Sequence, residues 1–256
     1  MKSWAGVGEA YGNSYASLCA GTIDVLLDAL GTADGRSLLD AGAGTGELVA
    51  RATAAGWTAT GCEPEPTMRR VAERTHPGLP FIAGALPALP VSTASFDAVT
   101  ANFVLNHVDD PRASAREMRR AAAQGGMLAA TTWTSSPSWF WVEVCERAGI
   151  TPAAGERLPA EKDFDRTVAG FAAMLTDAGW RDLSTSERTW TWEASPEALW
   201  SSAEGGVASA GQFYRALDRT ERARFRSGFD AACAAHARGE VIPLLHSAAV
   251  AVGRAL

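Results

Sequence analysis

The chain has few cysteines, few lysines and no long hydrophobic run. Its four cysteines lie far apart and include no Cys-x-x-Cys pair: Cys19, Cys62, Cys145 and Cys233. This spacing argues against a disulfide framework or a zinc site and predicts reduced, mostly buried thiols. No other metal-ligand spacing is present, so we expect no bound metal. No apolar run approaches the ~20 residues that a transmembrane helix needs.

Basic residues are outnumbered by acidic ones. The chain has 23 Lys and Arg against 29 Asp and Glu, which gives a net charge of −6. Nucleic-acid binders usually carry a basic face, so a nucleic-acid partner is not expected. The first 20 residues lack the basic-then-apolar layout of a signal peptide. We therefore expect a soluble, cytoplasmic protein with no membrane partner, whose oligomeric state the sequence leaves open.

Strand and helix signals alternate through the first half of the chain. Apolar runs predict strands at 36–41, 57–63, 79–83, 96–103 and 126–133. Helical spacing predicts a leading helix at 14–30 and helices at 46–55, 66–75 and 111–123. This alternation predicts an α/β fold with a doubly wound, mostly parallel sheet and helices on both faces. At 256 residues the chain needs only a single domain, residues 1–256.

The second half is less regular. It predicts helices at 139–148 and 167–177, strands at 181–192 and 241–253, and a helical insertion at 195–238. Gly179 is expected to end the second of these helices. Residues 135–165 and 195–240 contain no recognisable motif.

A glycine-rich turn is the most informative feature of the sequence. In Leu38–Glu47 an apolar strand reaches Asp40, and three glycines follow at every second position. Glycines let a ligand approach the backbone, and the helix behind them presents free N–H groups. Dinucleotide sites use Gly-x-Gly-x-x-Gly around a pyrophosphate, which a carboxylate here would repel. The turn instead suits a ligand with an ammonium group and no phosphate, such as the methionine part of S-adenosylmethionine.

A second carboxylate supports this interpretation. Glu63 follows the predicted strand 57–63 at its end, where an acidic residue can accept both ribose hydroxyls. Leu38–Glu47 and Gly61–Pro64 together resemble the first two motifs of class I S-adenosylmethionine-dependent methyltransferases. Ser95–Pro111 looks like that family's fourth strand and following loop. Over residues 36–134 the resemblance rests on sequence motifs. Over residues 167–253 it rests only on the order of the predicted strands and helices.

The resemblance implies a fold and an activity. The fold is a seven-stranded Rossmann-like methyltransferase sheet with a C-terminal antiparallel hairpin and a helical insertion. The activity is methyl transfer from S-adenosylmethionine to a small-molecule acceptor at O, N or C, as in the broad bacterial group that modifies quinones and natural products. The chain would divide into a helical cap at 1–35, a cofactor-binding core at 36–134, and substrate covers at 135–165 and 195–240.

The resemblance also implies which residues hold the cofactor. They are Tyr15, Asp40, Gly42, Ala43, Gly44, Gly46, Glu63, Pro64, Met68, Ala85, Leu86, Asn102 and Phe103. One departure concerns adenine. The family usually has Gly-Asp after strand three, whereas this chain has Gly84-Ala85. Adenine must then be recognised by backbone near Leu86, by a side chain from elsewhere, or through water.

His107 and Asn102 are the candidate catalytic residues. A neutral imidazole could take the proton that a hydroxyl or amine acceptor must lose. Methyl transfer depends more on position than on acid–base chemistry, however, and His107 could simply pack within its loop. His246 in the last strand is a second candidate base. Asn102 lacks a following Pro-Pro-Tyr, which argues against a nucleobase or peptide-amide acceptor.

Nine tryptophans are many for this length. Trp133, Trp139, Phe140 and Trp141 cluster just after strand five, close to where an open α/β sheet places its ligand. We expect the acceptor to be flat or apolar and to be contacted by Tyr11, Trp139, Phe140 and Trp141. Core packing is the alternative, above all for Trp180, Trp190 and Trp192. Alternative functions are carboxyl or carrier-thioester O-methylation, non-catalytic S-adenosylmethionine binding and, more remotely, dinucleotide oxidoreduction.

Overall fold

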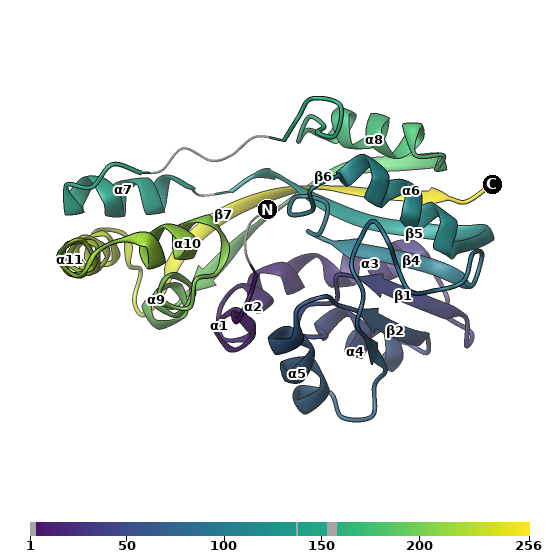
Figure 1. Ribbon diagram of the computed structural model, residues 1–256, viewed down its shortest axis with the longest axis horizontal. Helices are drawn as coiled ribbons and strands as arrows, with labels where there is room; N and C mark the ends of the chain where they lie inside the picture. The colour runs from purple at the N-terminus through teal and green to yellow at the C-terminus, as the bar shows by residue number, and fades with distance from the viewer. Residues whose placement is uncertain (1–3, 137, 153–157) are drawn as a thin grey trace.

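A seven-stranded sheet organises the computed structural model, which describes residues 4–136, 138–152 and 158–256 (Figure 1). The strand order is β3-β2-β1-β4-β5-β7-β6. The strands are β1 (Ser37–Ala41), β2 (Thr58–Cys62), β3 (Phe81–Ile82), β4 (Phe96–Asn102), β5 (Ala122–Ser135), β6 (Arg181–Ala194) and β7 (Ile242–Arg254). Strands β1 to β5 are parallel, and β7 pairs antiparallel with both β5 and β6. The predicted fold class, including the C-terminal hairpin, is confirmed.

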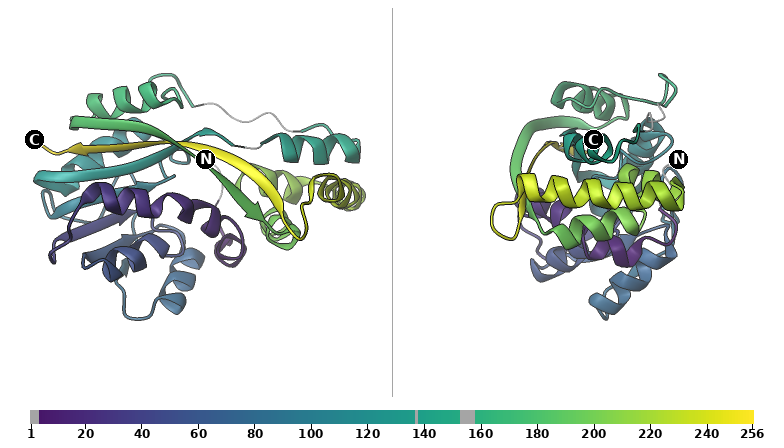
Figure 2. Two further views of the ribbon diagram at one scale, coloured as in Figure 1. Left: turned by 180° about the vertical axis from the view of Figure 1, so that it is seen from behind. Right: turned by 90° about the vertical axis from the view of Figure 1, so that its left-hand side faces the viewer.

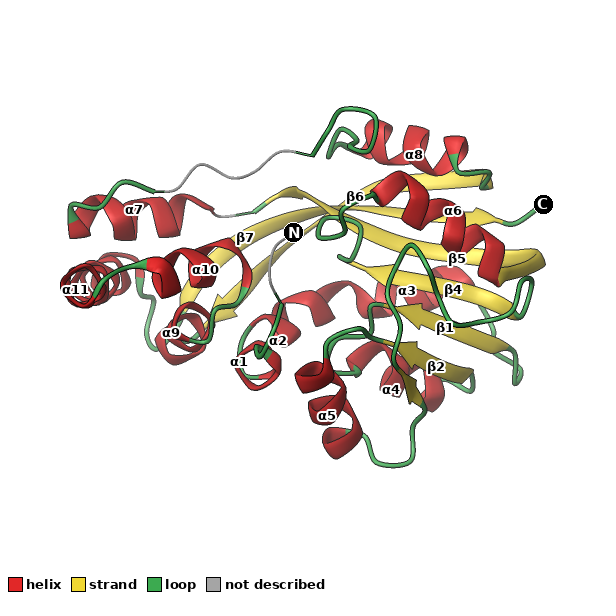
Figure 3. Ribbon diagram, viewed as in Figure 1, coloured by secondary structure: helices red, strands yellow, loops and turns green. Residues whose placement is uncertain are grey.

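Helices cover both faces of the sheet (Figure 3). Successive strand residues point to opposite faces, so Leu38 and Leu39 of β1 enter different cores. Leu38 packs with α3 (Ile23–Leu30) and α4 (Glu47–Ala54). Leu39 packs with α6 (Pro111–Ala121) and α8 (Val168–Asp177). The parallel strands are therefore buried on both sides, as their continuous apolar runs predict.

Capping residues fix where several helices begin. The Glu65 carboxylate accepts from the Thr67 N–H at the start of α5 (Pro66–Thr75), the range that the sequence predicts. Asp110 accepts from Ala113 N–H at the start of α6, and proline occupies the first turn of both helices. Gly179 follows α8 with a φ of +95°, consistent with its predicted role in ending that helix.

The predicted leading helix at 14–30 is wrong as a single element. It consists of α2 (Tyr15–Cys19), a 3₁₀ turn η1 (Ala20–Thr22) and α3. The turn lies where the chain crosses β6, and a Cβ on Gly21 would lie 2.6 Å from Nε1 of Trp190. The Thr22 hydroxyl donates to Asn102 Oδ1 of β4 over 2.8 Å. Contacts with the sheet therefore interrupt a helix that local periodicity alone would continue. A further short helix, α1 (Gly8–Gly12), packs against both α5 and α9 (Pro196–Glu204).

A second group of helices lies at one end of the long β6–β7 pair (Figures 1 and 2). It consists of α7 (Ser138–Ala148), α9, α10 (Ala208–Ala216) and α11 (Arg219–His236). Its core includes Phe140, Val144, Leu199, Phe225 and Phe229. The helical character predicted for 195–238 is confirmed. Within the predicted cover at 135–165, residues 137 and 153–157 lie outside the described residues, as do residues 1–3 of the predicted cap. No helix in the described ranges has the length and apolarity needed to cross a bilayer.

Candidate functional site

A cavity of about 630 Å³ opens at the carboxyl ends of β1, β2 and β4 and extends to the β6–β7 pair. Ligands of open α/β sheets bind at this edge. One part, here called the glycine end, is lined by Gly42, Gly44, Glu63, Pro64 and Met68. The opposite part, here called the aromatic end, is lined by Tyr15, Phe103, Trp133, Trp141, Trp192 and His246.

The glycine turn brings backbone to the cavity surface. Gly42 and Gly44 have φ values of +85° and +56°, a region that glycine adopts without strain. A Cβ on Gly42 would lie 2.5 Å from Cγ2 of Val104. Gly46 also has positive φ, but it faces away from the cavity, and a Cβ there would lie 2.7 Å from Cζ of Phe81. Gly46 and the buried Ala43 do not line the cavity. They shape the turn instead.

Asp40 lies behind the turn and is 2% exposed. It does not line the cavity itself. The Thr100 hydroxyl donates to its carboxylate over 2.8 Å. Burial raises the pKa of Asp40 to about 7, although the Thr100 hydrogen bond opposes this shift. A positively charged ligand beside the turn would stabilise the ionised form of this carboxyl group.

Glu63 lies on the cavity wall at the end of β2 and is 7% exposed. Its two oxygens accept hydrogen bonds from the N–H groups of Gly44 and Glu65, each over 2.9 Å. Burial raises its pKa, and these backbone hydrogen bonds oppose the rise. Each carboxylate oxygen keeps a further lone pair, so the group can still accept hydroxyl protons. Pro64 and Met68 line the wall beside it.

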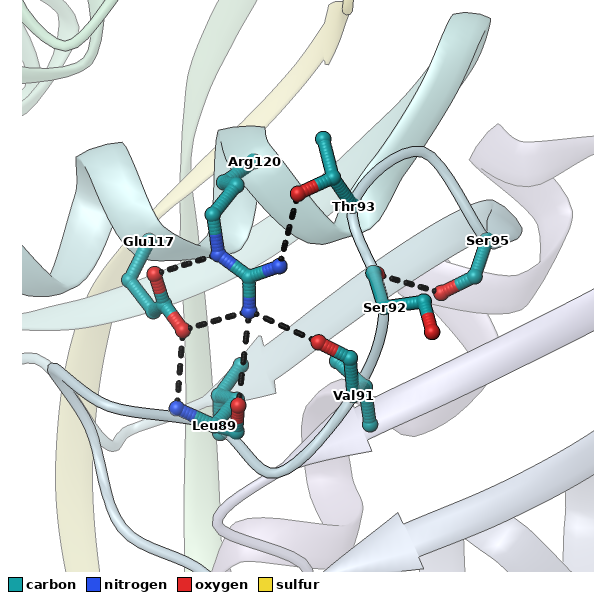
Figure 4. A network of polar contacts seen from close by, with 7 residues as sticks. All are labelled: Leu89, Val91, Ser92, Thr93, Ser95, Glu117 and Arg120. Carbon is teal, nitrogen blue, oxygen red and sulfur yellow. Dashed lines mark hydrogen bonds and ion pairs between the residues drawn. The ribbon is translucent and has the colours of Figure 1, made fainter.

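The loop after β3 brings Ala85 and Leu86 to the cavity, and α6 anchors its far side (Figure 4). The Arg120 guanidinium donates to the carbonyls of Leu89 and Val91 and to the hydroxyl of Thr93. Glu117 accepts from Arg120 and from the Leu89 N–H. This network fixes the loop, while Ala85 offers no side-chain acceptor toward the cavity. Sequence reasoning did not identify Arg120 and Glu117, because nothing near them in the chain marks the loop that they hold.

Asn102, a candidate catalytic residue, makes three hydrogen bonds within the protein through its side chain. Its Oδ1 accepts from the hydroxyls of Thr22 and Thr131 over 2.8 and 2.7 Å, and its Nδ2 donates to the Cys19 carbonyl over 2.9 Å. Both lone pairs of the amide oxygen are thereby occupied. Asn102 lines the cavity, but its polar contacts tie the N-terminal segment to β4 and β5. These contacts favour a positioning role, and the catalytic role of Asn102 stays a prediction.

Phe103 and His107 follow Asn102 along the cavity wall. Phe103 has a φ of +59° and donates its N–H to Thr131 Oγ1 over 2.9 Å. Its ring stacks on Trp133 with centroids 3.7 Å apart and an interplanar angle of 10°. The His107 ring meets the edge of Trp4, with centroids 4.9 Å apart. Tyr11 also lines the cavity, and a Cβ on Gly44 would lie 3.4 Å from its ring.

Two of the predicted acceptor-contacting residues lie elsewhere. Phe140 is fully buried in the core of the second helical group, and Trp139 is 44% exposed on the outside of α7. Only Trp141 of the three lines the cavity. Consecutive helical residues project about 100° apart, so three in a row cannot share one face.

Trp133 and Trp192 line the cavity together with Trp141. Trp133 follows the buried residues of β5, and Trp192 lies on β6 opposite Leu244 of β7. Leu244 and His246 are two residues apart and so share one face of β7. Sequence reasoning gave core packing as the alternative for Trp192, and Trp192 is both buried in the core of the second helical group and part of the cavity lining. The alternation of side chains along β6 and β7 was the only sequence signal for these positions, and it does not show which face of the strands borders a cavity.

Comparison with known proteins identifies the family. Residues 39–130 match the family described as "Methyltransferase domain". The chain is 31% identical over 176 residues to a demethylmenaquinone methyltransferase of Renibacterium salmoninarum, and the match covers 62% of this chain and 73% of the relative. The chain belongs to the class I S-adenosylmethionine-dependent methyltransferases. It is therefore an enzyme of methyl transfer, as the sequence motifs predict.

Solved structures share the fold of this methyltransferase. The YcgJ protein of Bacillus subtilis superimposes with a TM-score of 0.58 at 17% identity, covering 92% of this chain and 98% of that one. Phosphoethanolamine N-methyltransferase 2 of Haemonchus contortus, solved with S-adenosyl-L-methionine, gives a TM-score of 0.53 at 18% identity and covers 91% and 52%. The family implies S-adenosylmethionine as the cofactor.

The glycine end suits that cofactor. Its ionisable groups at the turn are the carboxylates of Asp40 and Glu63, and no Arg or Lys is among the described residues lining the cavity. A site for a pyrophosphate would present cations or unopposed N–H groups. Buried carboxylates beside an apolar wall instead match a ligand with a positive charge, hydroxyl groups and no phosphate.

Proposed function

We propose that this enzyme transfers a methyl group from S-adenosylmethionine to a small, flat and largely apolar acceptor held in the same cavity. The observation that carries the proposal is the continuity of one cavity from the glycine end to the aromatic end. Methyl transfer from a sulfonium requires donor and acceptor to meet in line within a water-poor space. A cavity with these two ends would hold donor and acceptor side by side in one space.

The cofactor would lie along the glycine end. Gly42 and Gly44 would allow its methionine part to approach the backbone, and Asp40 would favour its ammonium group from behind the turn. Glu63 would accept the two ribose hydroxyls. Ala85 and Leu86 would flank adenine with backbone groups, since Ala85 has no side-chain acceptor. Tyr15, Met68 and Phe103, which line the cavity, would complete the apolar wall.

The acceptor would lie at the aromatic end. Trp133, Trp141 and Trp192 line this end of the cavity, and aromatic side chains suit a flat apolar molecule. The absence of Arg and Lys from the described lining argues against a carboxylate or phosphorylated carrier as the acceptor. The relatives named demethylmenaquinone methyltransferases support an acceptor of the quinone type, whose reduced form carries hydroxyl groups on an aromatic ring.

Bound S-adenosylmethionine would supply an electrophilic methyl group on a sulfonium. The protein's own contribution would be mainly positioning. Asn102 fixes the N-terminal segment against the sheet, which holds Tyr11 and Tyr15 at the cavity. The ring faces near the sulfonium would also favour its positive charge. A base role for His107 stays a prediction that rests on its place in the cavity wall.

The predicted covers would exclude water from this reaction. Ala208, Ser209 and Ala210 at the start of α10 line the cavity, and so does Ser138 of α7. Helix α1 packs between α5 and α9, joining the N-terminal cap to the helical insertion. We infer that the cap and the two insertions together close over both substrates.

Calorimetry with nucleotide ligands tests the proposal. S-Adenosylmethionine and S-adenosylhomocysteine should bind with micromolar affinity, whereas NAD and ATP should not bind. NAD has two phosphates that the carboxylates at the glycine end would repel. NAD binding as strong as that of S-adenosylhomocysteine would contradict the cofactor assignment.

A further inference from the structure

His246 is a buried polar side chain at the aromatic end. It projects from β7, is 4% exposed, and lines the cavity. Its Nδ1 lies 2.9 Å from the Leu244 carbonyl oxygen. A carbonyl can only accept, so Nδ1 must carry the proton in that hydrogen bond. In the neutral ring, the other nitrogen, Nε2, is then left with a lone pair.

The surroundings keep the ring neutral. Burial lowers the pKa of His246, although the Leu244 hydrogen bond opposes this shift. The residues that contact the ring on β5 and β6 are Trp133, Trp190 and Trp192, with centroid distances of 5.4, 5.8 and 6.3 Å. From α2, the titratable Tyr15 and Cys19 line the cavity, and burial raises the pKa of both, so both are neutral. No charged side chain among the described residues perturbs His246.

The two neighbouring tryptophans differ in their hydrogen bonds. The Trp192 Nε1 donates to Ser17 Oγ over 3.1 Å, whereas the Trp190 Nε1 is buried without a partner among the described residues. The Nε2 of His246 makes no hydrogen bond to any described residue. Since His246 lines the cavity, this lone pair can accept a hydrogen bond from a ligand bound there.

We propose that His246 Nε2 accepts a hydrogen bond from a hydroxyl group on an aromatic acceptor and so selects hydroxyaromatic substrates. The inference rests on the proposed function and specifies its substrate class. The acceptor would lie beside Trp133, whose ring is stacked on Phe103 and Trp190 and so is held in place next to the end of β4. His246 would therefore hold the acceptor close to Phe103, which lies between the aromatic end and the glycine end.

A hydroxyl group fits this position better than other donors. An ammonium group would be buried with no carboxylate beside His246, which is unfavourable in an apolar pocket. A neutral hydroxyl donates one hydrogen bond and carries no charge. The surrounding tryptophan rings favour an aromatic scaffold over an aliphatic one.

The experiment compares two probes that differ only in the hydroxyl group. Binding of 1-naphthol and of naphthalene to the full chain is measured by tryptophan fluorescence quenching, with saturating S-adenosylhomocysteine present. An apolar cavity would favour naphthalene, because it has no polar group to desolvate. We expect the wild-type protein to prefer 1-naphthol by about tenfold, the size of one well-made hydrogen bond.

Three variants test whether the preference for 1-naphthol over naphthalene depends on His246. His246→Phe should reduce it to about twofold or less, whereas His246→Gln, whose Oε1 can replace Nε2 as acceptor, should retain about fivefold. Both variants lose the Nδ1 hydrogen bond to Leu244, so the difference between them isolates the acceptor position. His236→Asn, a change at a histidine paired with Glu143 outside the cavity, should leave the preference unaltered.

Calorimetry of S-adenosylhomocysteine on the same samples separates the two proposals. Normal S-adenosylhomocysteine binding with no preference for 1-naphthol, or with no naphthol binding, would overturn the role of His246 alone. That role would also be overturned if His107→Phe removed the preference and His246→Phe kept it. Loss of S-adenosylhomocysteine binding in the wild-type protein would overturn the proposed function and this inference with it.

Discussion

The glycine end of the cavity is formed by backbone at the end of β1 and the Glu63 carboxylate at the end of β2, with Asp40 behind the turn, whereas the aromatic end is formed largely by aromatic side chains from β5, β6, β7 and α7. The first depends on φ values that few residues adopt and on acidic groups at fixed positions. The second depends on shape and apolar area, which many side chains can supply. We infer that the glycine end is the part common to the family's cofactor chemistry, and that the aromatic end is where this enzyme's acceptor preference resides.

The largest expected effect is on stability, and it concerns the core of the second helical group, which lies behind the aromatic end. Phe140→Ala should lower the free energy of unfolding by about 3–5 kcal/mol, because the ring is fully buried among Val144, Leu199 and Phe229. Trp139→Ala, on the exposed side of the same helix, should cost under about 1 kcal/mol. Chemical denaturation measures both. Equal losses would mean that α7 is rotated relative to its place in this structure.

The next effect tests the glycine end. Gly44→Val should weaken S-adenosylhomocysteine binding by at least about 100-fold, or about 2.7 kcal/mol. The β-branched side chain is strained at a φ of +56° and would occupy the cavity wall. Gly78→Val is the matched control, since Gly78 has a φ of +87° and open space around it. It should lose stability but keep its affinity for S-adenosylhomocysteine. Equal affinity losses would show backbone strain rather than obstruction of the site.

A smaller effect concerns the ribose. Glu63→Ala should weaken S-adenosylhomocysteine binding by about 1–3 kcal/mol, through loss of charge-assisted hydrogen bonds. Glu63→Gln keeps the side-chain length and one acceptor oxygen, so calorimetry should place it between the wild-type and Ala proteins. An unchanged affinity in Glu63→Ala would show that the ribose lies elsewhere.

The smallest effect is a dependence on pH. The Asp40 carboxyl group has a pKa of about 7, and a bound ammonium group favours its ionised form. Affinity for S-adenosylmethionine should therefore rise by about tenfold between about pH 5.5 and about pH 7. Asp40→Asn should reduce that slope and leave the part due to Glu63, whose pKa burial also raises. If the affinity of the wild-type protein did not change over this pH range, the ionisation of Asp40 would not contribute to cofactor binding.

The same shift affects stability in the cofactor-free protein. The pKa of Asp40 is raised on folding, so the folded state favours the protonated form. The contribution of Asp40 to stability is thus full below its unfolded pKa of about 3.9 and is lost as the pH rises through about 7. S-Adenosylmethionine should stabilise the protein most at and above neutral pH, where its ammonium group can pair with the ionised carboxylate.

The two ends also differ in how far the sequence predicts them. The glycine turn and Glu63 are recognisable because strand, turn and helix follow one another along the chain and backbone geometry restricts the residue types. Trp192 and His246 come together only when β6 pairs with β7. The alternation of side chains along a strand shows which residues of that strand share a face, but not which face borders a cavity.

Other differences have similar causes. The break at Ala20–Thr22 depends on contacts with Trp190 and Asn102, which are distant in the sequence. Trp139 and Phe140 resemble an acceptor wall because they are close in sequence, yet helical geometry separates them. Local signals thus predicted the strands and the turn well, whereas contacts between distant segments determined the acceptor side.

The structure of the complex with S-adenosylhomocysteine tests the central claim most directly. The account predicts ribose hydroxyls on Glu63, the amino acid part against Gly42 and Gly44, and the sulfur atom directed past Phe103 toward Trp133 and His246. It would be contradicted by a ribose away from Glu63, or by a sulfur atom directed away from the aromatic end.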